Sequence, residues 1–262
     1  MTKSTLNVAL WQGESHPGNV QKNVDDVARI ASLAVAQSAE ILVFPECFLT
    51  GYYTSADVAD IAASVDDAVM ERLQSIARDT GLTIVIGSYE QTETAIHNAA
   101  FVFHPQIGMI GPYRKRMLYG DWEKSTFQAG IEPLIFSLNG FKVGVLICFD
   151  VEFPERCREL AHLGADLIVV PTALMSPFEN VARVMVPSRA MENGACVAYA
   201  NRIGTEVDLH YTGRSCIAGA DGSDLARACA DQSELLVARI SKKQLDQARH
   251  SVDYLSELSA NP

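Results

Sequence analysis

Residues 142–171 read KVGVLICFDVEFPERCRELAHLGADLIVVP. Both ends of this stretch are short apolar runs rich in β-branched residues, which predict strands. Residues 154–163 between them predict a helix. The stretch is therefore interpreted as a strand–helix–strand unit, and reactive groups in such α/β units gather where strands end and loops begin.

The first half of the chain repeats this order. Residues 6–11 are a short apolar run, residues 23–38 are Ala-rich with apolar positions near a 3.6-residue period, and residues 41–44 form a second apolar run that stops at Pro45. No Gly-, Ser- or Pro-rich linker separates the two units. We therefore predict one α/β domain over residues 1–262, with pseudo-symmetric halves, two sheets covered by outer helices, and a C-terminal tail from about residue 248.

The remaining pattern fills in this architecture. A hairpin is expected around Asn139-Gly140, a pair typical of tight turns, and Gly81 is expected to end a helix. Further strands are predicted at residues 83–87, 99–104, 109–114, 196–201, 215–220 and 235–240, and further helices at residues 68–80, 182–193 and 241–247.

Composition excludes several classes of protein. The 21 Lys and Arg residues against 32 Asp and Glu give a net charge of −11, which argues against binding to nucleic acid through phosphates. The longest apolar runs, residues 143–149 and 167–175, are too short to span a membrane. Residues 1–8 lack the apolar segment of a signal peptide. We expect a cytoplasmic protein with no nucleic-acid or membrane partner, six reduced cysteines and no structural metal.

Three strand ends carry chemically active side chains: Glu46, Lys115 and Cys148. Cys148 lies just before the helix predicted from residue 154, where a helix N-terminus would lower the pKa of the thiol. Each side chain also has an ordinary structural explanation, as a loop cap, a solvated cation and a core thiol respectively. Together they supply the nucleophile, the proton carrier and the cation that amide hydrolysis requires.

The residues around these three positions resemble a known family. Phe44-Pro45-Glu46, Tyr113-Arg114-Lys115 and Cys148-Phe149-Asp150 with Phe153-Pro154-Glu155 are similar to the three signatures of the nitrilase superfamily of carbon–nitrogen hydrolases. The resemblance covers nearly the whole chain in order. It implies a four-layer α-β-β-α sandwich with two mixed sheets and a catalytic triad that needs no metal or organic cofactor. In that triad Glu46 is the general base, Lys115 stabilises the tetrahedral intermediate, and Cys148 is the nucleophile.

The resemblance extends to a fourth catalytic position. Glu123 is similar to a second glutamate of the family, which positions the lysine and the substrate. The chain departs from the family at Glu152, where Arg is usual, and at Met117, where His is frequent. The resemblance also implies at least a homodimer, with the helix around residues 183–192 and the C-terminal segment at the contact.

The triad does not choose among amide, nitrile and N-carbamoyl substrates. The resemblance favours an amidase acting on a small carboxamide, because true nitrilases are usually longer and only seven residues separate Lys115 from Glu123 here. Arg183 or Arg202 would bind the distal carboxylate of an ω-amide, provided that either reaches the site. Residues expected to form an apolar, aromatic substrate pocket are Tyr52, Tyr119, Trp122, Phe149, Leu174 and Met175.

Other classes of function remain open from the sequence. The chain would be a binding or scaffold protein if the fold were kept without catalysis, but the intact Glu46, Lys115 and Cys148 argue against this. A glutaminase that feeds ammonia to a partner would need a fused synthetase domain. An unrelated thiol hydrolase would place its base on an Asp such as Asp25, for which nothing in the pattern argues.

Overall fold

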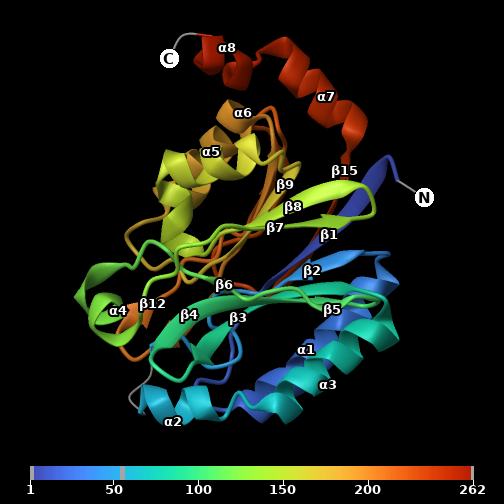
Figure 1. Ribbon diagram of the computed structural model, residues 1–262. Coiled ribbons are helices and arrows are strands. Elements are labelled where there is room, and N and C mark those ends of the chain that lie inside the picture. The colour runs from blue at the N-terminus through green and yellow to red at the C-terminus, as the bar shows by residue number, and fades with distance from the viewer. Residues whose placement is uncertain (1–2, 54–56, 261–262) are drawn as a thin grey trace.

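The computed structural model describes residues 3–53 and 57–260, in which two β-sheets lie between two layers of helices (Figure 1). The first sheet has the strand order β15-β1-β2-β3-β4-β5, with β6 pairing with β4, and the second has the order β14-β13-β10-β9-β8-β7. The first sheet comprises β1 (Thr5–Gln12), β2 (Ile41–Val43), β3 (Thr83–Gln91), β4 (Ile96–His104), β5 (Gly108–Met109), β6 (Tyr113–Arg114) and β15 (Glu234–Ser241). The second comprises β7 (Leu134–Leu138), β8 (Phe141–Val145), β9 (Leu167–Pro171), β10 (Cys196–Ala200), β13 (Cys216–Ala218) and β14 (Asp224–Arg227), while β11 (Thr205–Glu206) and β12 (Leu209–His210) pair separately.

Helices cover the outer faces of both sheets. In Figure 1, α1 and α3 lie against the first sheet, and α5 and α6 lie against the second. The α-helices are α1 (Val20–Ala36), α2 (Val58–Ala63), α3 (Asp67–Thr80), α4 (Gly120–Thr126), α5 (Pro154–His162), α6 (Val186–Asn193), α7 (Lys242–Ser251) and α8 (Tyr254–Ala260). Two short turns, the 3-10 turn η1 (Cys148–Glu152) and the π turn η2 (Val181–Met185), complete the helical segments. The predicted four-layer α-β-β-α sandwich is confirmed.

The two halves have matching topology. Strand β1 pairs in parallel with β2, and β8 pairs in parallel with β9, each across one intervening helix. An antiparallel strand then flanks each unit, β15 beside β1 and β7 beside β8. The pseudo-symmetry expected from the repeated sequence order is therefore present, and it brings the ends of equivalent strands together.

The core follows from the two-residue alternation of the strands. In β1, Leu6, Val8 and Leu10 pack between the two sheets, whereas Ala9 and Trp11 pack toward α1 and α3. All five side chains are buried. Successive side chains of a strand point to opposite faces, so a strand covered on both sides reads as a continuous apolar run.

Local signals placed several boundaries correctly. Asn139 and Gly140 both have positive φ, 53° and 93°, as a tight hairpin turn between β7 and β8 requires. Gly81 ends α3 with a φ of 72°, a left-handed conformation that favours glycine. The hairpin and the helix end predicted from these residues are confirmed.

Three expectations need correction. The strand expected over residues 109–114 is divided into β5 and β6, because Gly111 adopts a φ of 78° and Pro112 lacks a backbone N–H. The helix expected over residues 182–193 begins as the π turn η2 before α6. The expected tail from residue 248 is helical, in α7 and α8, as far as Ala260; residues 261–262 lie outside the described chain.

The C-terminal helices are tied to the rest of the fold. Arg249 of α7 donates hydrogen bonds to the carbonyl oxygens of Gly194 and Ala165, at 2.8 and 3.1 Å. Helix α8 contacts α6. These side-chain anchors lie far apart in sequence, which is why the pattern of residues 248–262 alone did not predict ordered helices.

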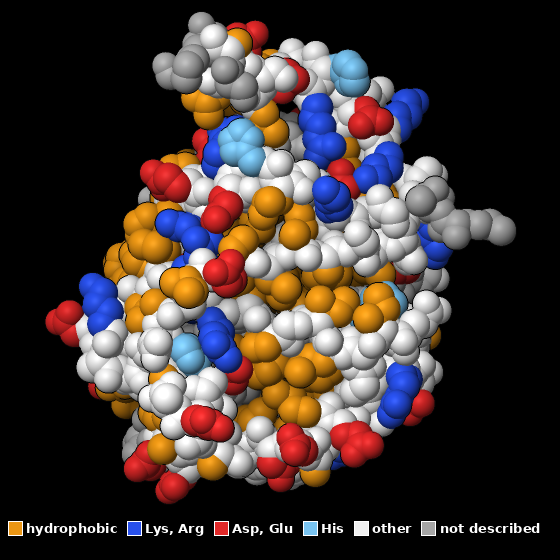
Figure 2. All heavy atoms as spheres, in the orientation of Figure 1, with side chains coloured by type: hydrophobic (Ala, Val, Ile, Leu, Met, Phe, Trp, Pro, Cys, Tyr) orange, Lys and Arg blue, Asp and Glu red, His pale blue; other side chains and the backbone are white. Residues whose placement is uncertain are grey.

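The molecular surface mixes charges. On the face shown in Figure 2, acidic and basic side chains are interspersed and no continuous basic surface is visible. Among the described residues, none of the helices is both long enough and apolar enough to cross a membrane.

Candidate active site

Four candidate catalytic residues come from four separate segments. Glu46 follows β2, Lys115 follows β6, Glu123 lies in α4, and Cys148 begins the turn η1 after β8. The end of β2 meets the end of β9, where the backbone N–H of Glu46 donates to the carbonyl of Thr172. Packing of the two sheets thus places loops from both halves around one site.

Lys115 is the centre of a buried charge cluster. Its Nζ lies 2.7 Å from Glu46 Oε1 and 2.6 Å from Glu123 Oε1, and all three side chains are inaccessible to solvent. Burial lowers the pKa of Lys115, but the charges of Glu123 and Glu46 together outweigh it and hold that pKa well above its usual range. The two carboxylates therefore favour the ammonium form of Lys115. Its neighbours Arg114 and Arg116 point away and pair with Glu90 and Glu159.

The two oxygens of Glu46 have different surroundings. Oε1 accepts hydrogen bonds from Asn98 Nδ2 and from Lys115 Nζ, both at 2.7 Å. Oε2 has no hydrogen-bond partner among the described residues, although it is buried. Burial raises the pKa of Glu46 against the opposing charge of Lys115. This carboxylate thus has one oxygen fixed in place and one oxygen available to take up a proton.

Glu123 differs because both of its oxygens are occupied. Oε1 accepts from Lys115 Nζ and, at 2.6 Å, from the hydroxyl of Tyr52, and Oε2 accepts from the backbone N–H of Tyr119 at 2.7 Å. The side chain is fully buried. Glu123 is therefore placed to hold Lys115 and Tyr52 rather than to transfer protons.

Cys148 lies at the start of η1 in a left-handed conformation, with a φ of 42°. Such backbone strain in a residue other than glycine is characteristic of functional sites. Burial raises the pKa of the Cys148 thiol, and the charge of Glu46 raises it further. The lowered pKa expected from a helix N-terminus is wrong, because η1 separates Cys148 from α5 and the thiol is desolvated.

Asp150 connects the Lys115 and Cys148 segments. Its Oδ2 accepts from the hydroxyl of Tyr113 at 2.8 Å and from the backbone N–H of Ile147 at 3.0 Å. Its Oδ1 accepts from the backbone N–H of Met117 at 2.7 Å. A single buried carboxylate therefore fixes the position of β6 relative to the turn that carries Cys148.

A cavity of about 200 Å³ opens beside Cys148. Five of the six predicted pocket residues lie on its wall: Tyr52, Tyr119, Phe149, Leu174 and Met175. Trp122 does not line it but packs behind Tyr52, with ring centroids 5.6 Å apart. The wall also contains residues that the sequence did not single out for substrate binding: Glu152, Ala173 and Phe178.

The two arginines considered for a distal carboxylate do not reach this cavity. Arg183 is exposed in η2, and Arg202 is buried in an ion pair with Glu206. Glu206 also accepts from the backbone N–H groups of Tyr52 and Tyr53, each at 3.0 Å. Arg202 thus stabilises the loop that carries Tyr52. The condition under which it or Arg183 would bind a distal carboxylate, that either reaches the site, is not met.

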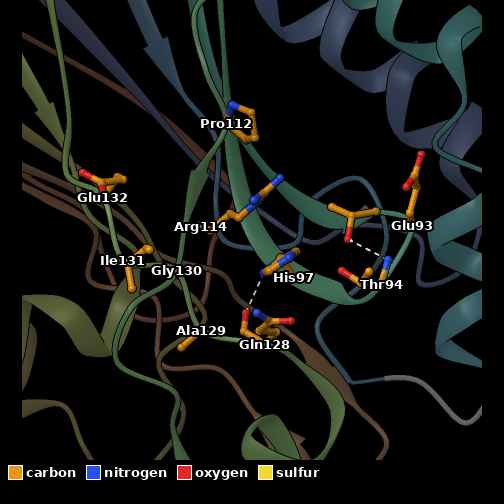
Figure 3. Close-up of a pocket in the computed structure, with 11 residues that line it drawn as sticks. Glu93, Thr94, His97, Pro112, Arg114, Gln128, Ala129, Gly130, Ile131 and Glu132 are labelled. Carbon is orange, nitrogen blue, oxygen red and sulfur yellow. Dashed lines mark hydrogen bonds between the residues drawn. The ribbon is translucent and has the colours of Figure 1, made fainter.

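A larger depression of about 730 Å³ is lined by residues of β4, of β6 and of the segment that follows α4 (Figure 3). His97 and Arg114 line it, while their chain neighbours Asn98 and Lys115 face the charge cluster. His97 Nδ1 lies 2.7 Å from the carbonyl oxygen of Gln128. The depression is open and contains no Cys, Ser or Lys among its lining residues, so the smaller cavity is the candidate active site.

Comparisons with known proteins agree with this geometry. Residues 7–250 match the carbon–nitrogen hydrolase family. The chain belongs to this family. It is 39% identical to a Pseudomonas protegens protein described as "Hydrolase in pqqF 5'region". That alignment covers 97% of this chain and 89% of the relative. It is 38% identical to a nitrilase from Pyrococcus abyssi, in an alignment that covers 84% of this chain and 83% of the relative. It is 30% identical to an (R)-stereoselective amidase from a Pseudomonas species, with 96% of this chain and 91% of the relative covered.

A solved structure is similarly close. The amidase from Nesterenkonia sp. AN1, in complex with acrylamide, superimposes with a TM-score of 0.86 and 33% identity over 96% of this chain and 97% of that chain. The chain is an amidase-like hydrolase of the nitrilase superfamily.

Asn98 and Asp150 are site residues to which the sequence analysis gave no role. Asn98 had a usable signal, since it shares the inward face of β4 with Ala100 and Val102, which lie in the core between the sheets. A polar residue in an apolar stripe needs a partner, and here the partner is Glu46. Asp150 carried no such signal, because its donors Tyr113 and Met117 come from a segment that meets it only in the fold.

Proposed function

We propose that this protein hydrolyses the C–N bond of a small carboxamide through a Cys148 thioester. The observation that carries the proposal is the Glu46–Lys115–Glu123 cluster. It combines a fixed ammonium with a carboxylate whose Oε2 has no partner among the described residues. Cys148 lines the cavity next to this cluster. A thiol, a base and an oxyanion-stabilising cation are the groups required for acyl transfer to a thiol.

The reaction begins with proton transfer from the Cys148 thiol to Glu46 Oε2 as sulfur attacks the carbonyl carbon. Lys115 stabilises the negative charge that develops on the carbonyl oxygen. The C–N bond then breaks, the proton on Glu46 passes to the leaving nitrogen, and ammonia departs. Glu46 next takes a proton from water, whose oxygen attacks the thioester, and returning that proton to sulfur releases the acid and restores the thiol.

Amides are the favoured substrates because of the relatives. The (R)-stereoselective amidase is a relative in sequence, and the Nesterenkonia amidase shares the fold and has been solved with acrylamide and with butyramide. The Pyrococcus abyssi nitrilase makes nitriles the second candidate. N-carbamoyl amines are the third, since the same thiol attack on their carbonyl would release ammonia.

Ammonia release from matched amides, nitriles and N-carbamoyl amines tests the proposal. We expect the parent protein to release ammonia from amides, and Cys148→Ala to release none. Cys157→Ala is the matched control, because Cys157 is also buried but lies in α5 and does not line the cavity. Activity on nitriles alone would replace the amidase proposal, and full activity of Cys148→Ala would refute the thioester.

A further inference from the structure

We propose that the cavity selects amides whose acyl chain carries an ammonium group, and that Glu152 binds that group. The inference rests on the proposed function, because it names the substrate class of the same site. It concerns the part of the substrate that remains in the acid product. It also assigns a role to the position where the sequence departs from the family's usual arginine.

Glu152 is the one charged side chain among the described residues that line the cavity; its neighbours there are aromatic or aliphatic, apart from the Cys148 thiol. It is partly buried, and no Lys, Arg or His among the described residues forms an ion pair with it. Arg189 is close, but its Nη2 binds the Glu152 backbone carbonyl at 2.8 Å, its Nε binds the Val151 carbonyl, and its Nη1 binds Glu192. Among the described residues the Glu152 carboxylate therefore has no cation in direct contact, although the charges of Lys115 and Arg189 act on it from farther away.

The surrounding charges favour a cation in the cavity. Lys115 is the ammonium whose charge acts on Glu152, and it is shared between Glu46 and Glu123. When Glu46 carries the thiol proton, the Cys148 thiolate, Glu123 and Glu152 carry three negative charges. The cations that act on Glu152 are Lys115 and Arg189, and Arg189 also pairs with Glu192. Burial raises the pKa of Glu152, so an incoming ammonium would offset the desolvation of its ionised form. A carboxylate on the substrate would meet repulsion instead.

The spacing along η1 limits the length of the substrate. Cys148 and Glu152 are the first and last residues of this 3-10 turn, which at about 2 Å per residue separates their backbones by about 8 Å along its axis. A short acyl chain spans such a gap once both side chains extend into the cavity. Suitable probes are three amides of nearly equal size: 3-aminopropanamide, butyramide and malonic acid monoamide, which end in an ammonium, a methyl and a carboxylate group.

The test compares kcat/KM for these three amides. In the parent protein we expect 3-aminopropanamide to exceed butyramide by about tenfold or more, and malonic acid monoamide to be the poorest substrate. Glu152→Gln should bring the ammonium-to-methyl ratio close to one, and Glu152→Arg should make malonic acid monoamide the preferred substrate. Glu155→Gln is the matched control, because Glu155 is exposed at the start of α5 and outside the cavity wall, so it should keep the parent ratio.

Binding separates failure of this inference from failure of the proposed function. Calorimetry with Cys148→Ala, with and without Glu152→Gln, measures the affinities of the same three amides without turnover. If the parent protein releases no ammonia from any amide, the proposed function falls, and tighter binding of 3-aminopropanamide that depends on Glu152 still supports the selectivity. A parent ratio near one, or a high ratio that persists in Glu152→Gln, would overturn the role of Glu152.

Discussion

Replacing Glu123 by Gln should destabilise the fold, whereas replacing Glu46 by Gln should scarcely do so. The two substitutions remove the same charge from the same cluster, and each leaves Lys115 with one carboxylate. They differ in the donors that the new amide group meets. From the sequence alone, Glu123 beside Lys124 could equally be a solvated ion pair. The expected difference in stability between the two variants therefore comes only from the structure.

The magnitude follows from the hydrogen bonds. Every oxygen of Glu123 faces a donor. An NH₂ group in the Oε1 position would meet Lys115 and Tyr52, and one in the Oε2 position would meet the Tyr119 N–H. One buried donor left against another donor costs about 2 kcal/mol, within the usual range of about 1–3 kcal/mol. For a chain of this size that corresponds to a decrease in Tm of about 4–8 °C. In Glu46→Gln the NH₂ occupies the Oε2 position, which has no donor beside it among the described residues, and Oε1 keeps Asn98 and Lys115.

Thermal unfolding at neutral pH and ammonia release from one amide measure both effects. We expect Glu123→Gln to lose several degrees of Tm and more than about tenfold in turnover, about 1.4 kcal/mol of transition-state stabilisation. Glu46→Gln should keep a Tm within about 2 °C of the parent yet lose about a hundredfold or more in turnover, because it lacks the base. A Glu46→Gln protein as unstable as Glu123→Gln would refute the distinction between an occupied and a free oxygen.

Three further outcomes are expected. Lys115→Arg should abolish ammonia release although it keeps the charge, because a planar guanidinium cannot replace a compact buried ammonium, and Arg116→Lys should remain active; parental rates in Lys115→Arg would show that charge alone suffices. Turnover should rise with pH through a pKa above the ordinary 4.5 of a glutamate, because only ionised Glu46 accepts the thiol proton, and a pH profile of kcat/KM without this acidic limb would contradict Glu46 as the base. Light scattering should show at least a homodimer, with Arg183 and Met191 of the helix near residues 183–192 as positions to substitute; a species of 28.5 kDa at all micromolar concentrations would remove this proposal.

Much of the fold could be predicted from local patterns. The strand–helix–strand units were visible because each buried strand is an apolar run and each covering helix has a 3.6-residue period. Helices α2 and α4 were missed, since six and seven residues are too few to show that period. The division of residues 109–114 was missed because an apolar run does not show which backbone groups find partners.

In the candidate site too, features carried by local sequence were predicted, and features that depend on packing were not. Glu46, Lys115 and Cys148 were found because each lies at a strand end in a recognisable motif, and the structure brings their segments together. Trp122 was assigned to the pocket because it is aromatic and near Glu123 in sequence, yet it packs behind Tyr52. The pKa of Cys148 was expected to be lowered, because proximity to a helix is visible in the sequence whereas desolvation is not.

The high pKa of the thiol is compatible with catalysis because the proton moves within the buried cluster. Burial raises the pKa of Cys148 and that of Glu46 alike, which means that losing a proton to solvent is unfavourable for both groups. Transfer of the proton from sulfur to Glu46 Oε2 leaves the net charge of the cluster unchanged, and Lys115 stays beside the negative charge before and after the transfer. The low dielectric of the site therefore opposes isolated ionisation of the thiol much more than it opposes the coupled step. In the proposed mechanism, a carboxylate with one fixed and one free oxygen would provide that coupling, so the unpartnered Oε2 is the atom on which the proposal depends.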